Sequence, residues 1–126
     1  MEILRIEQTD DCPLVILDPV DNQFEIAGKS LPEDVLEFYE PVLDWLNTYK
    51  EEPRSLTALD IKLIYFNTAS SKMLMDIMLV LEEMVEDGQE VVIRWHSHLI
   101  DEDMQEAGKE FEEMVAVPFE HLTYEN

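Results

Sequence analysis

Cysteine, glycine and long apolar segments are all scarce in this sequence of 126 residues. The one cysteine, Cys12, cannot form a disulfide within the chain, and we expect it to be a partly buried turn residue of a protein in the reducing cytoplasm. With three glycines, the chain has no glycine-rich motif that could cradle a phosphate group. The longest apolar run is interrupted by Asp76 and Glu82, and it falls short of the roughly 20 residues that a membrane-spanning helix needs.

Basic residues are few as well. Eight lysines and arginines stand against 30 aspartates and glutamates, which gives a formal net charge of −22. Such a charge repels nucleic-acid phosphates and anionic lipids, so a basic protein partner fits better. Hydrophobic residues still make up 46% of the chain, which is enough for a folded core. We therefore expect a single domain over residues 1–126 that binds neither nucleic acid nor membranes.

The periodicity of apolar residues predicts six strands and three helices. The strands are expected at residues 3–7, 13–17, 23–27, 57–66, 90–96 and 118–124. The helices are expected from within 28–34 to about 49, from about 70 to 85, and from 100–103 onward. The first three strands are joined by tight turns, whereas the later strands alternate with helices. We therefore predict an α/β fold of order βββαβαβαβ, with a mixed sheet, an antiparallel N-terminal meander and three packing helices.

The spacing also predicts details of these elements. Pro32 should lie in the first turn of the first helix, and Pro41 should kink that helix without ending it. The fourth strand should place four residues on one face: Leu59, Ile61, Leu63 and Tyr65. The last helix should bury a stripe made of Met104, Gly108 or Ala107, Phe111, and Met114 or Val115.

Short polar residues follow the fourth strand, in the segment Asn67-Thr68-Ala69-Ser70-Ser71-Lys72. One interpretation is that Asn67, Thr68 or Ser70 caps the next helix, because short polar side chains are the preferred caps. The other is that a hydroxyl here accepts a phosphoryl group, whose negative charge a helix N-terminus tolerates well. The two interpretations are compatible, and side-chain chemistry alone does not choose among Thr68, Ser70 and Ser71.

The helix that follows is apolar nearly all round, and only Asp76 interrupts the run from Met73 to Leu81. Burial between the sheet and another helix would explain this pattern. Alternatively, part of the surface near Thr68 is exposed for a partner, because methionine-rich surfaces adapt well to partners. The predicted partner-binding residues are Met73, Leu74, Met75, Ile77 and Met78.

A metal site or a catalytic site is not favoured. His96 and His98 could point to one face of a strand, but no recognised metal-ligand spacing accompanies them, and a solvated strand-end loop is the better interpretation. Adjacent acidic pairs such as Glu82-Glu83 point in different directions on a helix and are typical of a solvated surface. We therefore predict no catalytic residues, no cofactor and no metal, and a protein that is acted upon by others.

Four segments, in order, resemble the SiaC family of bacterial regulatory phosphoproteins. They are Gly28-Lys29-Ser30-Leu31-Pro32-Glu33-Asp34, Phe38-Tyr39-Glu40-Pro41-Val42-Leu43-Asp44-Trp45-Leu46, Tyr65-Phe66-Asn67-Thr68-Ala69-Ser70-Ser71-Lys72 and Asp101-Glu102-Asp103-Met104-Gln105-Glu106-Ala107-Gly108. The resemblance implies a fold like that of STAS-type anti-sigma-factor antagonists, with Thr68 as the phosphoacceptor. The segment 96–99 departs from the family pattern, which there favours acidic or tyrosine residues, so the resemblance assigns it no role.

The resemblance also implies the partners. A SiaB-like protein kinase would phosphorylate Thr68, and a SiaA-like phosphatase of the PP2C type would remove the phosphate. The unphosphorylated protein would bind and activate a SiaD-like diguanylate cyclase, raising cyclic di-GMP and promoting aggregation or biofilm formation. Two alternatives remain: a partner switch that acts on an anti-sigma factor, and a small metal-dependent enzyme that uses His96 and His98.

Overall fold

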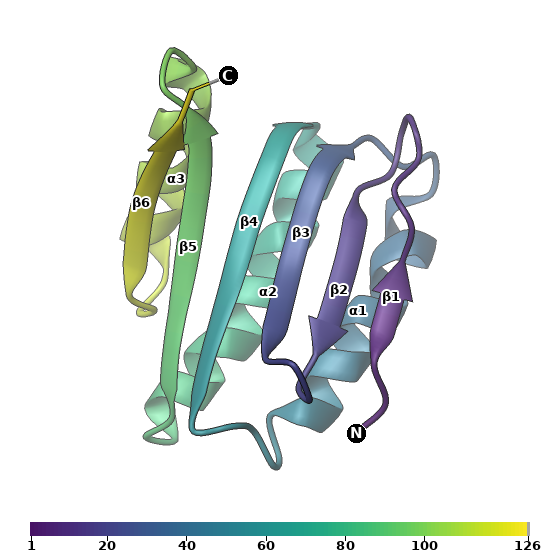
Figure 1. The fold of residues 1–126 in the computed structure, drawn as a ribbon, viewed down its shortest axis with the longest axis vertical. Coiled ribbons are helices and arrows are strands. Elements are labelled where there is room, and N and C mark those ends of the chain that lie inside the picture. The colour runs from purple at the N-terminus through teal and green to yellow at the C-terminus, as the bar shows by residue number, and fades with distance from the viewer. Residues whose placement is uncertain (126) are drawn as a thin grey trace.

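The chain order of the elements follows the predicted alternation (Figure 1). The computed structural model describes residues 1–125, and within them the chain forms six strands and three helices. They are β1 (Leu4–Ile6), β2 (Leu14–Asp18), β3 (Gln23–Ser30), α1 (Val35–Tyr49), β4 (Leu56–Phe66), α2 (Thr68–Glu86), β5 (Glu90–His98), α3 (Glu102–Met114) and β6 (Phe119–Tyr124). The prediction of a βββαβαβαβ order is confirmed.

The strands form one mixed sheet in which spatial order equals chain order, β1-β2-β3-β4-β5-β6. β1 pairs antiparallel with β2 and β2 with β3, whereas β3, β4, β5 and β6 pair parallel in that order. Each parallel step needs a crossover, and a helix supplies it every time. The predicted fold class, with its antiparallel start and parallel second half, is therefore confirmed.

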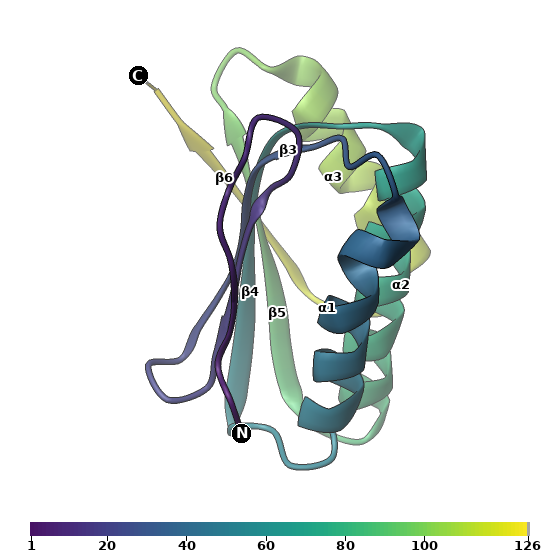
Figure 2. The ribbon, with the colours of Figure 1, turned by 90° about the vertical axis from the view of Figure 1, so that its right-hand side faces the viewer.

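All three helices lie on the same face of the sheet (Figure 2). The residues of each strand that point toward them are buried, as with Leu59, Ile61 and Leu63 in β4 and Val91, Ile93 and Trp95 in β5. The alternate residues, which include Asp60, Lys62, Arg94 and His96, lie on the face that carries no helix. The protein is thus a two-layer structure whose core lies between the sheet and one layer of helices.

The first helix begins later than the sequence predicts. β3 continues to Ser30, because residues 28–30 still pair with β4, and α1 begins at Val35. Asp34 is the N-cap, and its side chain accepts a hydrogen bond from the backbone N–H of Glu37 at 3.0 Å. Pro32 therefore precedes the helix instead of lying in its first turn. The prediction that one helix continues across Pro41 is confirmed.

A bulge in β4 changes which residues face the core. Gly28 pairs with Leu63 but Lys29 pairs with Tyr65, so Ile64 is an extra residue in β4. An extra residue reverses the alternation of faces beyond it. Tyr65 is accordingly 53% exposed, and Phe66 turns inward to pack against Trp95. The prediction that Tyr65 shares the face of Leu63 is wrong for this reason.

The last helix settles two alternatives that the spacing left open. Gly108, and not Ala107, is the fully packed residue of the α3 stripe, together with Met104 and Phe111. Val115 is buried just after the helix, whereas Met114 is 60% exposed. No helix within residues 1–125 is long and apolar enough to cross a bilayer.

Candidate functional site

The junction between β4 and α2 is held by a helix cap. Asn67 is the N-cap of α2, and its side-chain oxygen accepts a hydrogen bond from the backbone N–H of Ser70 at 2.8 Å. The backbone N–H of Asn67 in turn donates to the carbonyl of Ser30 at the end of β3, at 3.2 Å. The prediction that this polar segment caps the helix is confirmed, and Thr68 is the first residue of α2.

A chain of buried hydroxyl groups lies beneath this cap. Tyr39 and Ser30 share a hydrogen bond of 2.6 Å, and the Ser30 hydroxyl donates to Oγ of Ser70 at 2.8 Å. The Ser70 hydroxyl donates to the Ser30 carbonyl at 2.9 Å, which completes the chain. All three side chains are fully buried. The network therefore ties the first turn of α2 to β3 and to α1, because a buried hydroxyl without a partner would cost about 1–3 kcal/mol.

Accessibility separates the three candidate phosphoacceptors. Ser70 is fully buried, and its hydroxyl is engaged with Ser30. Ser71 is half-buried, and its hydroxyl donates to the carbonyl of Thr68 at 2.7 Å. Thr68 is exposed on the first turn of α2. A modifying enzyme can thus reach Thr68 without unfolding the junction, whereas modification of Ser70 would require α2 to detach from β3.

The electrostatic setting of Thr68 suits an added anion. The first turn of α2 contains no acidic residue, although the chain as a whole is strongly acidic. The first backbone N–H groups of a helix lack helical partners and carry the positive end of its dipole. Lys72 follows one turn later on the same side of the helix and is exposed. A phosphate on Thr68 would therefore have favourable local partners.

Tyr39 provides a titratable marker of the buried network. Burial raises the pKa of Tyr39 from 10.0 to about 12, the hydrogen bond with Ser30 acts in the opposite direction, and Cys12 adds a smaller upward effect. Between these two pH values the folded protein retains the phenol proton, whereas the unfolded chain loses it. Stability contributed by this group is thus fully present below pH 10 and falls as the pH rises toward 12.

We expect this loss to reach about 2 kcal/mol at pH 11.5, since each pKa unit corresponds to about 1.4 kcal/mol and the titration of the folded protein is centred near pH 12. Urea unfolding at pH 7, 10 and 11.5 would measure it against the variant Tyr39→Phe. The variant should be about 1 kcal/mol less stable at pH 7, because it lacks the hydrogen bond to Ser30, but it should lose less stability in alkali. Parallel curves for the two proteins would show that Tyr39 is not the responsible group.

The predicted partner-binding residues on α2 are mostly inaccessible. Met73 is 4% exposed, and Leu74, Ile77 and Met78 are not exposed at all. They face the sheet and the flank of α1, which packs beside α2, so the alternative of burial by the sheet and another helix is confirmed. The prediction of an exposed methionine surface is wrong for these four residues. Met75 is half-buried and remains at the edge of the core.

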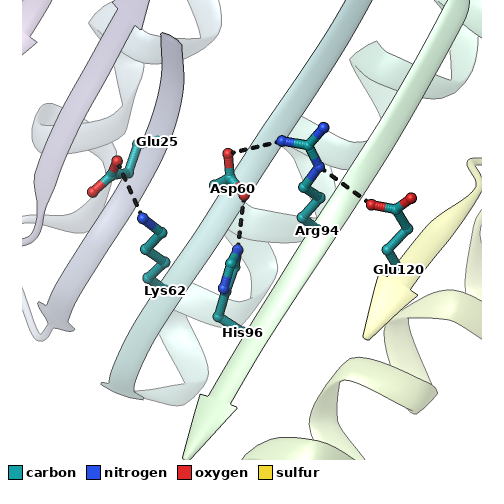
Figure 3. A network of polar contacts seen from close by, with 6 residues as sticks. All are labelled: Glu25, Asp60, Lys62, Arg94, His96 and Glu120. Atoms are coloured by element: carbon teal, nitrogen blue, oxygen red, sulfur yellow. Dashed lines mark hydrogen bonds and ion pairs between the residues drawn. The ribbon is translucent and has the colours of Figure 1, made fainter. Parts of the chain in front are cut away.

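His96 and His98 do not lie in a loop, because β5 continues through His98. Nε2 of His96 lies 2.8 Å from Oδ1 of Asp60, on the face that carries no helix (Figure 3). A guanidinium nitrogen of Arg94 lies 3.6 Å from the same carboxylate, and its Nε donates to Glu120 at 3.2 Å. The His96–Asp60 contact is a hydrogen bond, and the two ion pairs of Arg94 are partly exposed and worth about 1 kcal/mol or less each. They link β4, β5 and β6 across the sheet surface.

The ring nitrogens of His96 and His98 contact nearby protein groups. Nδ1 of His98 accepts a hydrogen bond from the backbone N–H of Ile100 at 3.2 Å, so that ring nitrogen is engaged locally. Within the described part of the chain, no group of three or more histidine, cysteine, aspartate or glutamate side chains is arranged to hold a metal ion. The polar cluster is therefore best described as cross-strand pairing.

Two members of the buried network were missed from the sequence. Ser30 alternates inward with Phe24, Ile26 and Gly28, a period of two that could have indicated its burial. Tyr39 lies three residues before Val42 on the buried side of α1, but no local signal shows that its hydroxyl meets Ser30. That contact depends on how α1 packs over the end of β3.

Comparison with known proteins gives a consistent result. Residues 6–124 match the family described as SiaC family regulatory phosphoprotein. The chain is 34% identical, over 119 residues and 94% of each chain, to an uncharacterised protein of Pseudomonas aeruginosa strain UCBPP-PA14.

Solved structures agree with this match. SiaC of Pseudomonas aeruginosa is 31% identical and superimposes with a TM-score of 0.89, over 98% of this chain and 100% of that one. A chain in the crystal structure of the P. aeruginosa diguanylate cyclase SiaD in complex with its activator SiaC is 32% identical, with a TM-score of 0.91, over 96% and 99% of the two chains.

Proposed function

Because the chain belongs to the SiaC family of regulatory phosphoproteins, we propose that it is a non-catalytic regulator that binds and activates a diguanylate cyclase while Thr68 is unmodified. The observation that carries the proposal is the placement of Thr68. This residue is exposed at the start of α2, next to the Asn67 cap and to the buried hydrogen bonds between Ser70 and Ser30. The likeness to SiaC, seen in complex with the cyclase it activates, supports the choice of partner.

The proposal includes the two enzymes that add and remove the phosphate on Thr68. A SiaB-like protein kinase would phosphorylate Thr68, and a SiaA-like phosphatase of the PP2C type would reverse the reaction. Both would act in the cytoplasm, where the cyclase finds its GTP, on a single SiaC-type domain. Rising cyclic di-GMP would then promote aggregation and biofilm formation. Support comes from the exposed position of Thr68 and from the Asn67 cap, which orders the backbone around it.

The direct test is reconstitution with the SiaD-like cyclase of the same cells. Unmodified protein added to the purified cyclase should raise the rate of cyclic di-GMP formation by a factor of about 5–150, which corresponds to a typical coupling free energy of about 1–3 kcal/mol. Product is measured by chromatography, with the cyclase alone and the regulator alone as controls. An unchanged rate at saturating regulator, with no complex on size-exclusion chromatography, would contradict the proposal.

A further inference from the structure

Two hydrogen bonds hold the chain on either side of Thr68, and both end at the backbone carbonyl oxygen of Ser30. The N–H of Asn67, the residue before Thr68, donates to this oxygen at 3.2 Å. The hydroxyl of Ser70, which follows Thr68 in the same turn, donates to it at 2.9 Å. Thr68 therefore lies in a short segment that one atom holds at both ends, and its position depends on where β3 ends.

The end of β3 that carries this oxygen is itself fixed. Ser30 pairs with Phe66 in the last parallel register between β3 and β4. The next residue, Leu31, donates its backbone N–H to the carbonyl of Asp11 at 2.7 Å, which joins the chain to the segment between β1 and β2. Helix ends fray unless other parts of a protein hold them. Here the first turn of α2 is attached to the sheet, so the conformation around Thr68 is restricted.

The buried hydroxyl groups form a chain in which each proton has one destination. A hydroxyl has one proton to donate, and the proton of Ser70 goes to the carbonyl of Ser30. Ser30 must then be the donor in its 2.8 Å bond to Oγ of Ser70, which leaves Tyr39 as the donor in the 2.6 Å bond to Oγ of Ser30. All three side chains are fully buried, so bulk water does not compensate for a lost member.

We propose that Ser70, Ser30 and Tyr39 are positioning residues for the phosphorylation of Thr68. This inference rests on the proposed function, in which a kinase modifies Thr68. In that reaction Oγ1 of Thr68 forms a bond to the γ-phosphorus of ATP, the bond from this phosphorus to the β,γ-bridging oxygen breaks, and ADP leaves. The hydroxyl proton passes to a base on the kinase. Attack needs the hydroxyl oxygen in line with the bond that breaks, so the orientation of Thr68 affects the rate directly.

The three residues act through the backbone. Thr68 is the first residue of α2, so the direction of its side chain is defined only while the first turn of the helix is formed. The hydroxyl chain keeps this turn closed against β3. Without it, the turn would sample several orientations, of which only some present Oγ1 in line with ATP. The kinase would bind as before, because the three buried side chains offer it no contact, but fewer of the complexes would react.

Four substitutions separate positioning from stability. Ser70→Ala removes the side-chain bond to the carbonyl of Ser30, Ser30→Ala removes the link between Ser70 and Tyr39, and Tyr39→Phe removes the first donor. The matched control is Tyr49→Phe. Tyr49 is also fully buried, and its hydroxyl shares a bond of 2.7 Å with Oγ1 of Thr57. It is the last residue of α1, about 15 Å beyond Tyr39 along the helix axis, so the same chemical change is made far from Thr68.

Phosphorylation is measured with the purified SiaB-like kinase and ATP, at a temperature at which circular dichroism shows every variant to be folded. Mass spectrometry assigns the phosphate to Thr68, and initial rates give kcat and KM separately. We expect kcat to fall about tenfold in Ser70→Ala and about threefold in Ser30→Ala and Tyr39→Phe, with KM changed less than about twofold, since misalignment slows the chemical step without weakening binding. Tyr49→Phe should retain kcat within about 1.5-fold, although its hydroxyl also accepts a backbone N–H at 3.1 Å and the variant loses both bonds.

Unchanged kcat in Ser70→Ala and Ser30→Ala would overturn the positioning role and leave the proposed function standing. So would a rise in KM at constant kcat, or an equal loss of kcat in Tyr39→Phe and Tyr49→Phe, since the effect would then follow binding or stability. Tyr39→Phe removes a single oxygen atom, so it keeps the comparison decisive if a serine variant fails to fold. A wild-type protein that the kinase leaves without phosphate on Thr68 would overturn both the positioning role and the proposed switch.

Discussion

Stoichiometric phosphorylation of Thr68 should weaken binding to the cyclase by about 100-fold, or roughly 2–3 kcal/mol. The phosphate carries close to two negative charges and a tightly held hydration shell, and the partner would have to displace that shell on binding. The measurement is the dissociation constant of unmodified and phosphorylated protein, with the modified site assigned by mass spectrometry. Most of the loss should appear as faster dissociation, because the acidic field that attracts a basic partner at long range is not reduced.

Three variants control this prediction. Thr68→Ala should bind like the unmodified protein and resist the kinase, since Thr68 is an exposed first-turn residue and its loss leaves the Asn67 cap intact. Ser71→Ala should remain sensitive to the kinase. Thr68→Asp should reproduce part of the effect, because aspartate is smaller and carries less charge than phosphate. Phosphate found only on Ser71, or equal affinity of the modified and unmodified proteins, would contradict the assignment.

The salt dependence of the dissociation constant distinguishes two physical origins of the loss of affinity on phosphorylation. If the phosphate acted by long-range repulsion, raising the salt to about 0.5 M would remove most of the difference, because screening acts within a few ångströms at that concentration. Desolvation and steric exclusion at a contact are far less sensitive to salt. We therefore expect most of the 100-fold difference to survive high salt.

The parts of the fold that the sequence predicted well are those decided by local signals. The order of elements followed from alternating apolar residues in strands and three- or four-residue spacing in helices. The Asn67 cap followed from a short polar residue placed just before an apolar helix. Such features depend on a few neighbouring residues, so they can be recognised without knowledge of the tertiary structure.

The errors lie where distant segments decide the outcome. β3 extends to Ser30 because β4 pairs with it that far, and Asp34 competed with Ser30 and Leu31 as the helix start. The extra residue in β4 leaves no mark in the local pattern, so the outward turn of Tyr65 could not be read from alternation. In both cases strand pairing, which is set by residues more than 30 positions apart, overrode the local preference.

For the candidate site too, the sequence was sufficient where local residues decide and insufficient where tertiary packing decides. Thr68 was identified from the family motif, and its exposure agrees with that choice, whereas four of the five residues predicted as a partner surface on α2 are buried. A helix that is apolar nearly all round fits burial on several sides as well as an exposed patch. Only the packing of α1 and the sheet against α2 decides between them.

Gly108→Ala should destabilise the protein by about 2 kcal/mol, although alanine favours a helix over glycine by about 1 kcal/mol. A Cβ at this position would lie 2.5 Å from Cδ1 and 2.6 Å from Nε1 of Trp95. The indole cannot easily retreat, because its Nε1 donates to the carbonyl of Met104 at 2.9 Å and its ring packs against Phe66 and Phe111. Thermal unfolding should show a drop of roughly 5–10 °C in the midpoint.

A double-mutant cycle identifies the cause. In the background Trp95→Met, a flexible side chain can move aside, so Gly108→Ala should cost little there or stabilise the helix. An equal cost in both backgrounds would locate the strain elsewhere. A reduced cost in the Trp95→Met background would show that Gly108 serves the fold through its close approach to Trp95.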